Sequence, residues 1–368
     1  MTNIKDPYQD IRPYNDNEVP EALNRLILDD EFIQAIIQYR FPNCSKVVMW
    51  VLKPLLKVWL KTKWSNLKTV DDVQQHVANY MESTLKKTSD GITFSGLEHL
   101  DPSQSYLFVS NHRDIAMDPA VVNWGLHQRG LNTLRIAIGD NLLKKPCATE
   151  LMKLNKSFIV KRSAKGPREM MKVLGQLSGY IKHSLETGNS IWIAQKEGRA
   201  KDGNDKTDPA ILKMFHVEGR KRKLSFSDYV KELNIVPVSI SYENDPCDVA
   251  KAKELHQIES SGSYEKGEFE DIESIVQGII GQKGRVHVSF GEVIKQDFEN
   301  PEALAIEIDR QIHTNYKLFP INFLAAGEEN KAASEKAKIE LESKLAQLPK
   351  AAHPILIGMY ANPVLNQN

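Results

Sequence analysis

The sequence predicts an α/β protein with a central, largely parallel or mixed sheet flanked by helices and an N-terminal helical extension. From about residue 90 onward, short apolar, β-prone runs alternate with helical patterns, which is typical of a sheet covered by helices. One of these runs ends in histidine and acidic residues just before a helical pattern, as strands of α/β enzymes do. The 368 residues, 41% of them hydrophobic, suffice for one large domain with extensions or for two domains.

Residues 1–89 are expected to form the N-terminal helical region. A helical pattern runs over 21–40, is interrupted at Asp29 and Asp30, and ends at Phe41-Pro42. A further helix is expected over 70–87. The first ten residues, MTNIKDPYQD, contain no basic segment followed by an apolar one, so we expect no secretory signal.

Residues 44–64 (CSKVVMWVLKPLLKVWLKTKW) have the most unusual composition in the chain. The segment is apolar, carries Trp50, Trp59 and Trp64, and has five lysines but no acidic residue. Pro54 is expected to kink the helix or to start a second one. Two interpretations are open: the segment lies in a membrane interface with its lysines directed to anionic lipid phosphates, or it packs on the protein core with its lysines in solvent. No apolar run reaches about 18 residues, so no membrane-spanning helix is expected.

Residues 90–325 are expected to form the catalytic α/β domain. The stretch ITFSGLEHL after Gly91 predicts a strand and a turn, and further strands are expected at 106–110, 134–138, 157–161, 190–194, 235–242 and 285–290. Helices are expected at 120–127, 167–185, 225–232 and 271–280, with a loop containing a helical piece over 243–270. Residues 326–368 predict a solvated helix through Leu348 and a short apolar tail.

Composition excludes little about binding partners. Lys plus Arg equal Asp plus Glu at 48 each, so net charge points to no nucleic acid, and we expect none as a partner. The three cysteines, Cys44, Cys147 and Cys247, are far apart and lack metal-ligand spacing. We therefore expect reduced thiols in a cytosolic protein, and no metal site.

The first candidate site is LFVSNHRDIAMDP, which runs from Leu107 to Pro119. An apolar strand end passes directly into Asn-His-Arg-Asp. His112 is a candidate general base, and either Asp118 or Asp114 can accept a hydrogen bond from its other ring N–H. An alternative is purely structural: Asp118 before Pro119 suits a helix N-cap, Asp114 suits the cap of an earlier turn, and His112 is then an ordinary histidine.

Two basic stretches follow other predicted strands. In SFIVKRS, Lys161 and Arg162 leave a β-prone run, and arginine can bind a phosphate through two hydrogen bonds. In IWIAQKEGR, the strand passes into Glu197, Gly198 and Arg199, where the glycine permits a sharp turn and the cations suit an anion. A solvated strand end and a solvated basic loop are the plain alternatives.

The last candidate is NIVPVSISYE, where Pro237 lies inside a β-prone run. Proline argues against an ordinary central strand because it cannot donate to the hydrogen-bond ladder. It can mark a bulge or a strand start beside a site. The alternative is an edge strand with no functional role.

Taken in order, NHRDIAMDP, FIVKRS, QKEGR and IVPVSI resemble the four-block signature of the glycerolipid acyltransferases, which include glycerol-3-phosphate and 1-acylglycerol-3-phosphate acyltransferases. The resemblance covers about residues 90–295. It implies that a fatty acyl group passes from an acyl thioester, acyl-CoA or acyl carrier protein, to a hydroxyl of a glycerophosphate or lysophosphatidate in phospholipid synthesis. It implies no cofactor other than that co-substrate. Together with the reduced thiols and the segment 44–64, it leads us to expect a peripheral position on the cytoplasmic face of the membrane.

The resemblance also implies roles for individual residues. His112 matches the family's catalytic histidine, with Asp118 as its partner and Asp114 as a competitor for that role. Arg162 matches the arginine that holds the acceptor's phosphate, and Arg113 and Lys161 are further candidates for phosphate binding. The other matches in the substrate-binding blocks are Glu197, Gly198, Arg199 and Pro237.

The sequence departs from the family pattern in two places. Five residues separate His112 from Asp118 where the family has four, and Gln195-Lys196 stand where the family has Phe-Pro. Other activities fit the same residues: acylation of another lysolipid or of glycerol 3-phosphate itself, and ester or thioester hydrolysis with water as acceptor. A non-catalytic lipid-binding protein at the membrane surface is the alternative from another class.

Overall fold

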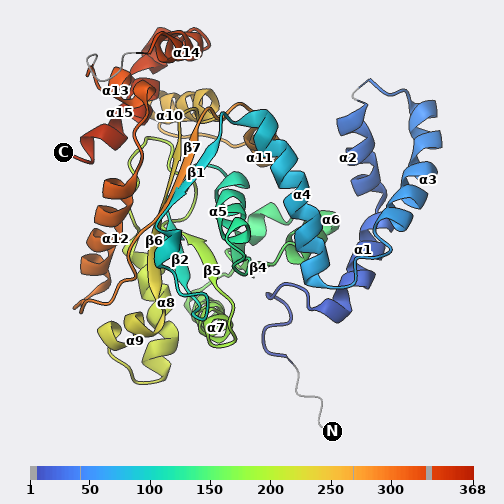
Figure 1. The fold of residues 1–368 in the computed structure, drawn as a ribbon, viewed down its shortest axis with the longest axis horizontal. Helices are drawn as coiled ribbons and strands as arrows, with labels where there is room; N and C mark the ends of the chain where they lie inside the picture. Colours follow the sequence, from blue (N-terminus) through green and yellow to red (C-terminus); the bar gives the residue numbers. More distant parts are fainter. Residues whose placement is uncertain (1–5, 42, 268, 329–333) are drawn as a thin grey trace. The chain divides into compact units, whose positions relative to one another are not determined.

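The computed structural model describes residues 6–41, 43–267, 269–328 and 334–368 (Figure 1). The chain divides into two compact units. The first comprises Met1–Tyr80 with Leu134–Tyr180, and the second comprises Met81–Thr133 with Ile181–Asn368. The expected domains at 1–89, 90–325 and 326–368 are consecutive stretches of sequence, whereas each compact unit combines two separate stretches. The expected domain division stays a prediction.

A largely parallel sheet forms the centre of the second unit. Its strands lie side by side in the order β1 (Ile92–Ser95), β7 (Val286–Phe290), β6 (Ile235–Tyr242), β2 (Leu107–Ser110) and β5 (Ile191–Ala194). Neighbouring strands are parallel except β6 and β7, which are antiparallel. The predicted α/β class with a mixed, largely parallel sheet is confirmed, and the predicted strand bounds are correct to within one residue.

Burial explains why these runs are largely apolar. All four residues of β2 and all eight of β6 are buried, as expected for strands that helices cover on both sides. Helix α12 (Pro301–Asn315) packs against β6, and α5 (Met117–Gln128) contacts β7. The two helices lie on either side of the strands in the view of Figure 1.

The expectation that Pro237 marks a bulge, a strand start or an edge strand is wrong. The residue lies inside the continuous strand β6, which has β2 on one side and β7 on the other. The carbonyl of Pro237 accepts a hydrogen bond from the N–H of Gly291 at 2.8 Å, just past the end of β7. A residue's N–H and C=O point to the same side of a strand, so the missing N–H of Pro237 faces a position where the β7 ladder has already ended.

Two further helices of the second unit, α9 (Phe226–Glu232) and α11 (Glu270–Ile280), agree with the prediction to within one residue. Others were not predicted or differ from the prediction: α8 (Pro209–Lys221), α10 (Asp248–Ser261), α13 (Pro320–Ala325), α14 (Glu335–Leu345) and α15 (His353–Leu365). Helix α10 fills much of the expected loop over 243–270, of which residue 268 lies outside the described residues. The expected helix up to Leu348 is confined to α14, and residues 329–333 of that stretch are also outside the description.

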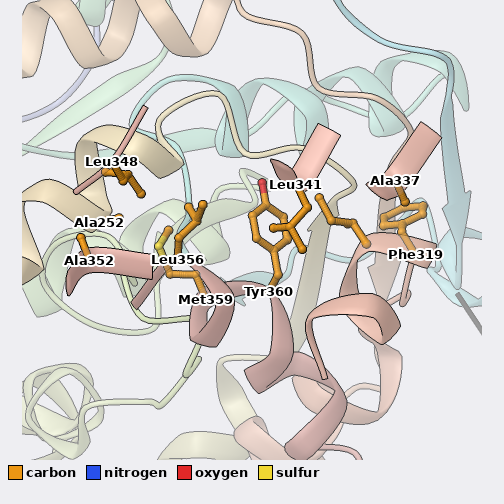
Figure 2. Close-up of a cluster of buried hydrophobic side chains, with 10 residues drawn as sticks. Ala252, Phe319, Ala337, Leu341, Leu348, Ala352, Leu356, Met359 and Tyr360 are labelled. Carbon is orange, nitrogen blue, oxygen red and sulfur yellow. The ribbon is translucent and has the colours of Figure 1, made fainter. Parts of the chain in front are cut away.

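The expected apolar C-terminal tail is instead helix α15, which belongs to a hydrophobic core. Figure 2 shows Leu356, Met359 and Tyr360 of α15 beside Leu341 of α14 and Phe319. Ala252 of α10 belongs to the same cluster. The tail is therefore apolar because it is buried.

The first unit contains a parallel pair, β3 (Arg135–Gly139) and β4 (Ser157–Val160), and the helices α1 (Val19–Leu28), α2 (Asp30–Arg40), α3 (Lys46–Lys63) and α6 (Pro146–Leu154). Helices α4 (Val70–Thr88) and α7 (Pro167–Glu186) have residues in both units. The interruption at Asp29 is a helix N-cap, because its carboxylate accepts from the N–H of Phe32 at 2.8 Å. The N-terminal helical extension is confirmed, while residues 1–5 and Pro42 lie outside the description.

Helix α3 is a single helix that continues through Pro54, so the second helix expected there is not formed. One face packs against α1 and α2 through Met49, Leu52, Leu56 and Leu60. The opposite face is apolar and exposed, with Val47 at 73%, Trp50 at 77% and Val58 at 66% exposure. Within the described part of the chain, no helix combines the length and the apolar character needed to cross a membrane.

Candidate active site

The polar residues after β2 gather around one hydrogen-bonded pair, His112 and Asp118. His112 follows the strand by two residues, and its Nδ1 lies 2.8 Å from Oδ2 of Asp118 at the start of α5. The Asp118 side chain is fully buried, whereas 14% of the His112 side chain is exposed. The structure therefore brings together the first of the two predicted pairs, and the catalytic role of that pair stays a prediction.

Four donors hold the carboxylate of Asp118. Besides His112, Oδ2 accepts from the backbone N–H groups of Arg113 at 2.6 Å and Asp114 at 2.9 Å. The hydroxyl of Tyr242, the last residue of β6, donates to Oδ1 at 2.9 Å. Oδ2 already accepts from two N–H groups, so it can only be the acceptor in its hydrogen bond with His112. Nδ1 of His112 therefore carries the proton and donates it to this bond.

The other ring nitrogen of His112 is left available. Its Nε2 makes no hydrogen bond with any residue that the structure describes. The imidazole makes an edge-to-face contact with the indole of Trp192 on β5, with 5.6 Å between the ring centroids. This contact restricts the orientation of the imidazole ring. With Nδ1 protonated, Nε2 carries the lone pair and can take a proton from a bound molecule.

Asp114 has a different task from Asp118. Its Oδ1 accepts from the N–H groups of Ala116 at 2.9 Å and Met117 at 2.8 Å, so it holds the turn that leads into α5, as the capping alternative for Asp114 predicts. The alternative in which Asp118 is the cap is wrong, because the helix already begins at Met117. Burial, with a contribution from Asp118, raises the pKa of Asp114 to about 6.

Arg113 lies in a buried ion pair. Its Nε and Nη2 donate to the two carboxylate oxygens of Asp205 at 3.2 and 2.6 Å. Asn111 binds the same carboxylate through Nδ2 at 3.2 Å and also exchanges hydrogen bonds with the backbone of Ile240 on β6. These hydrogen bonds connect the loop after β2 to the loop over 198–208 and to β6. The carboxylate of Asp205 thereby occupies the guanidinium of Arg113.

The third motif is attached directly to His112. The N–H of Ala200 donates to the carbonyl of His112 at 2.7 Å, and the N–H of Gln195 donates to Ser110 at 2.8 Å. Gly198 has a φ of +76°, so the sharp turn there favours glycine. The Nη2 of Arg199 donates to Ser274 at 3.3 Å, while its buried Nη1 has no hydrogen-bond partner among the described residues. The exposed Glu197 lies on the same loop.

Lys161 and Arg162 belong to the first unit. The ammonium of Lys161 forms an ion pair with Asp10. The backbone N–H of Arg162 donates to Asp140 at 3.1 Å, and its Nη1 donates to Oδ1 of Asn141 at 3.3 Å. Their expected contact with a phosphate stays a prediction.

Sequence reasoning missed three members of the site: Tyr242, Asp205 and Trp192. Each lies in or just beyond a stretch that was singled out, on β5, β6 or the loop after β5. The available signal was the rule that carboxyl ends of parallel strands meet at one edge of a sheet. In the described ranges, no three His, Cys, Asp or Glu side chains are grouped as metal ligands.

Comparisons with known proteins bear on the family. Residues 91–241 match the family model described as Acyltransferase. A search of curated proteins gave no significant match.

Among solved structures, the chain is similar to the 1-acyl-sn-glycerophosphate (LPA) acyltransferase PlsC from Thermotoga maritima. The TM-score is 0.39 and the identity 16%, over 80% of this chain and 94% of that one. At this TM-score the likeness indicates neither a substrate nor the position of any residue. The matched residues 91–241 contain all four motifs. The family predicted from the motifs is therefore confirmed, and residues 91–241 of this chain form an acyltransferase domain.

Proposed function

We propose that this acyltransferase moves a fatty acyl group from an acyl thioester to the hydroxyl of a glycerophosphate or lysophosphatidate in phospholipid synthesis. The observation that carries the proposal is the His112–Asp118 pair, which leaves a lone pair on Nε2 at a partly exposed position. Nε2 takes the proton of the acceptor hydroxyl while its oxygen attacks the thioester carbonyl carbon. The C–S bond then breaks, and the departing thiolate receives the proton from His112.

Asp118 supports both proton transfers. Its buried carboxylate faces the protonated Nδ1 at 2.8 Å, so it stabilises the imidazolium that forms when Nε2 accepts the proton. The two backbone N–H groups on the same oxygen keep that carboxylate in place. No covalent acyl-enzyme is required, because the acceptor oxygen attacks the thioester directly.

Several residues are proposed to bind anionic groups of the substrates. Arg162, with Lys161, binds the acceptor's phosphate, and Arg199 binds a further anionic oxygen through its unpartnered Nη1. Glu197 and Gly198 shape the loop beside Arg199, and Pro237 belongs to the strand beneath the site. Because Asp205 already occupies the guanidinium of Arg113, we leave Arg113 out of the phosphate site.

We also propose that the enzyme docks peripherally on the cytoplasmic face of a membrane through α3. Long-chain acceptors and products partition into bilayers, so the enzyme has to work at a surface. The exposed face of α3 combines Trp50 and Trp59 with valines and flanking lysines, which suits the headgroup region. The ammonium of Lys63 also lies over the Trp59 ring, 4.5 Å from its centroid.

Mass spectrometry of products from the purified protein tests the proposed reaction. The protein is given acyl-CoA or acyl carrier protein thioesters with a panel containing glycerol 3-phosphate, lysophosphatidate and other lysolipids. We expect an acylated glycerophosphate from the parent and at least a roughly thousandfold lower rate from His112→Ala. A comparable rate from a well-folded His112→Ala variant would contradict the mechanism.

The same panel separates the alternatives. Release of free fatty acid without an acylated product indicates a thioesterase. Binding of lysolipid vesicles with no turnover of any thioester indicates a lipid-binding protein. Acylation of only a non-phosphorylated lysolipid would contradict the proposed acceptor class and the role of Arg162.

A further inference from the structure

Tyr242 contacts the candidate catalytic pair from the opposite side of the carboxylate. It ends β6, which continues four residues past its last pairing with β2 at Val238. This extension brings the side chain to the start of α5, which carries Asp118. The tyrosine is 4% exposed, and its hydroxyl donates to Oδ1 of Asp118 at 2.9 Å.

The two oxygens of Asp118 are held very unequally. Oδ2 accepts from His112 and two backbone N–H groups, whereas Oδ1 accepts only from Tyr242 among the described residues. The three donors anchor Oδ2, but the carboxylate can still tilt about that oxygen through small changes in its two side-chain torsions. The hydroxyl of Tyr242 holds Oδ1 and so limits this tilt, and with it the direction in which Oδ2 presents its lone pair to Nδ1 of His112.

From this geometry we infer that Tyr242 is a positioning residue for acyl transfer, which orients His112 through Asp118. The inference rests on the proposed function, because it assigns a task only if His112 is the base. Burial is the main reason that the pKa of Tyr242 lies well above its ordinary value, and Asp118 and Asp114 raise it further. The hydroxyl thus keeps its proton and remains a donor to the carboxylate.

The expected effect on pH dependence follows from the charges around Asp118. Among the described residues, His112, Asp114, Tyr242 and Tyr316 are titratable groups that interact with it. Removal of the Tyr242 hydroxyl leaves more of the carboxylate's charge to interact with the His112 imidazolium. The protonated form of His112 is then favoured, so the acid limb of kcat/KM moves to higher pH.

Tyr242→Phe tests the inference, with Tyr360→Phe as a matched control. Tyr360 is another buried tyrosine of the second unit, and its hydroxyl donates to the buried carboxylate of Asp248 at 2.5 Å. Both variants lose a buried hydrogen bond to a carboxylate, so both should lose stability. We expect only Tyr242→Phe to lower kcat, by roughly 10- to 100-fold with KM little changed, and to shift the acid limb.

A second replacement covers the case in which Tyr242→Phe fails to fold. Site-specific 3-fluorotyrosine at position 242 keeps the shape but provides a stronger donor, so the acid limb should move to lower pH. Parent-like kcat and an unshifted limb in the folded fraction of either variant would overturn the inference. If instead the parent forms no acylated product, or His112→Ala remains active, it is the proposed function that fails.

Discussion

At the scale of single residues, the two aspartates beside His112 differ in what their oxygens accept. One oxygen of Asp118 accepts from Nδ1 of His112 and two backbone N–H groups, while Asp114 holds the turn that leads into α5. Asp118→Asn places an amide where only an acceptor fits, so kcat should fall by roughly 10³- to 10⁴-fold. Asp114→Asn keeps a carbonyl oxygen for this turn, and its effect on kcat should stay below about tenfold.

Steady-state kinetics of both variants, corrected for the folded fraction, measure this difference. Circular dichroism confirms that each variant is folded. A larger loss from Asp114→Asn than from Asp118→Asn would make Asp114 the partner of the histidine during turnover.

Asp114 should also affect how stability depends on pH. Its pKa is raised from 3.8 to about 6, mainly by burial, so the native state binds this proton more tightly than the unfolded state. The resulting stabilisation is fully present below the unfolded value and is lost as pH rises through about 6. Asp114→Asn removes this dependence. Its melting temperature relative to the parent should therefore rise by about 2–4 °C between about pH 4.5 and about pH 7.5.

Thermal melts of the parent and the variant at the two pH values give this difference. A difference that is the same at both values would contradict the raised pKa. A difference that falls as pH rises would mean that the native state favours the ionised carboxylate.

At the scale of elements, the sequence predicted the strands and helices whose local pattern matches their burial in the fold. The runs that became β2, β5 and β6 are largely apolar, and almost all of their residues are buried, including Ser239 and Ser241 of β6. The helices that begin at Pro209 and Pro301 were missed, although a polar N-cap residue precedes each of these prolines. Proline at the first helical position is the signal that could have found them.

Pro237 and the site partners show why the rest could not be predicted. Whether a missing N–H matters depends on where the neighbouring strand ends, and β7 lies about 50 residues further along the chain. The ion pair of Arg113 joins residues 92 positions apart, and the hydrogen bond of Tyr242 joins residues 124 positions apart. The motifs identified His112 and both aspartates and favoured Asp118 as the partner, whereas the distant members of the site depend on strand pairing that local pattern does not contain.

At the scale of the whole molecule, the loops of the second unit's site are braced by the C-terminal helices. Asn362 of α15 donates to the carbonyl of Asp202 at 2.6 Å, on the loop that leads to Asp205. Lys251 of α10 donates to the carbonyl of Arg113 at 2.6 Å and pairs with Asp245. These contacts attach the residues around His112 to the hydrophobic cluster in Figure 2. The C-terminal region therefore contributes to the rigidity of the site.

Membrane docking also belongs to this scale, because it concerns a surface of the protein and not a single contact. Trp50→Ser combined with Val58→Ser removes two of the most exposed apolar side chains of α3 and leaves its packed face unchanged. Liposome binding should weaken because less apolar area enters the headgroup region. Ile306→Ser on α12 is the matched control, since that isoleucine is 71% exposed and lies outside α3.

The lysines of α3 should contribute through charge. Each lysine near an anionic leaflet adds roughly 1 kcal/mol, and salt screens the attraction. Replacing Lys53, Lys57 and Lys61 with glutamine should therefore weaken binding most on anionic vesicles at low salt. Lys57 should contribute least, because Asp30 already pairs with it at 2.7 Å. Vesicle sedimentation measures binding, and turnover of a short-chain, water-soluble acceptor should survive in every variant. Parent-like sedimentation of both the apolar and the lysine variants would place the docking surface elsewhere on the protein.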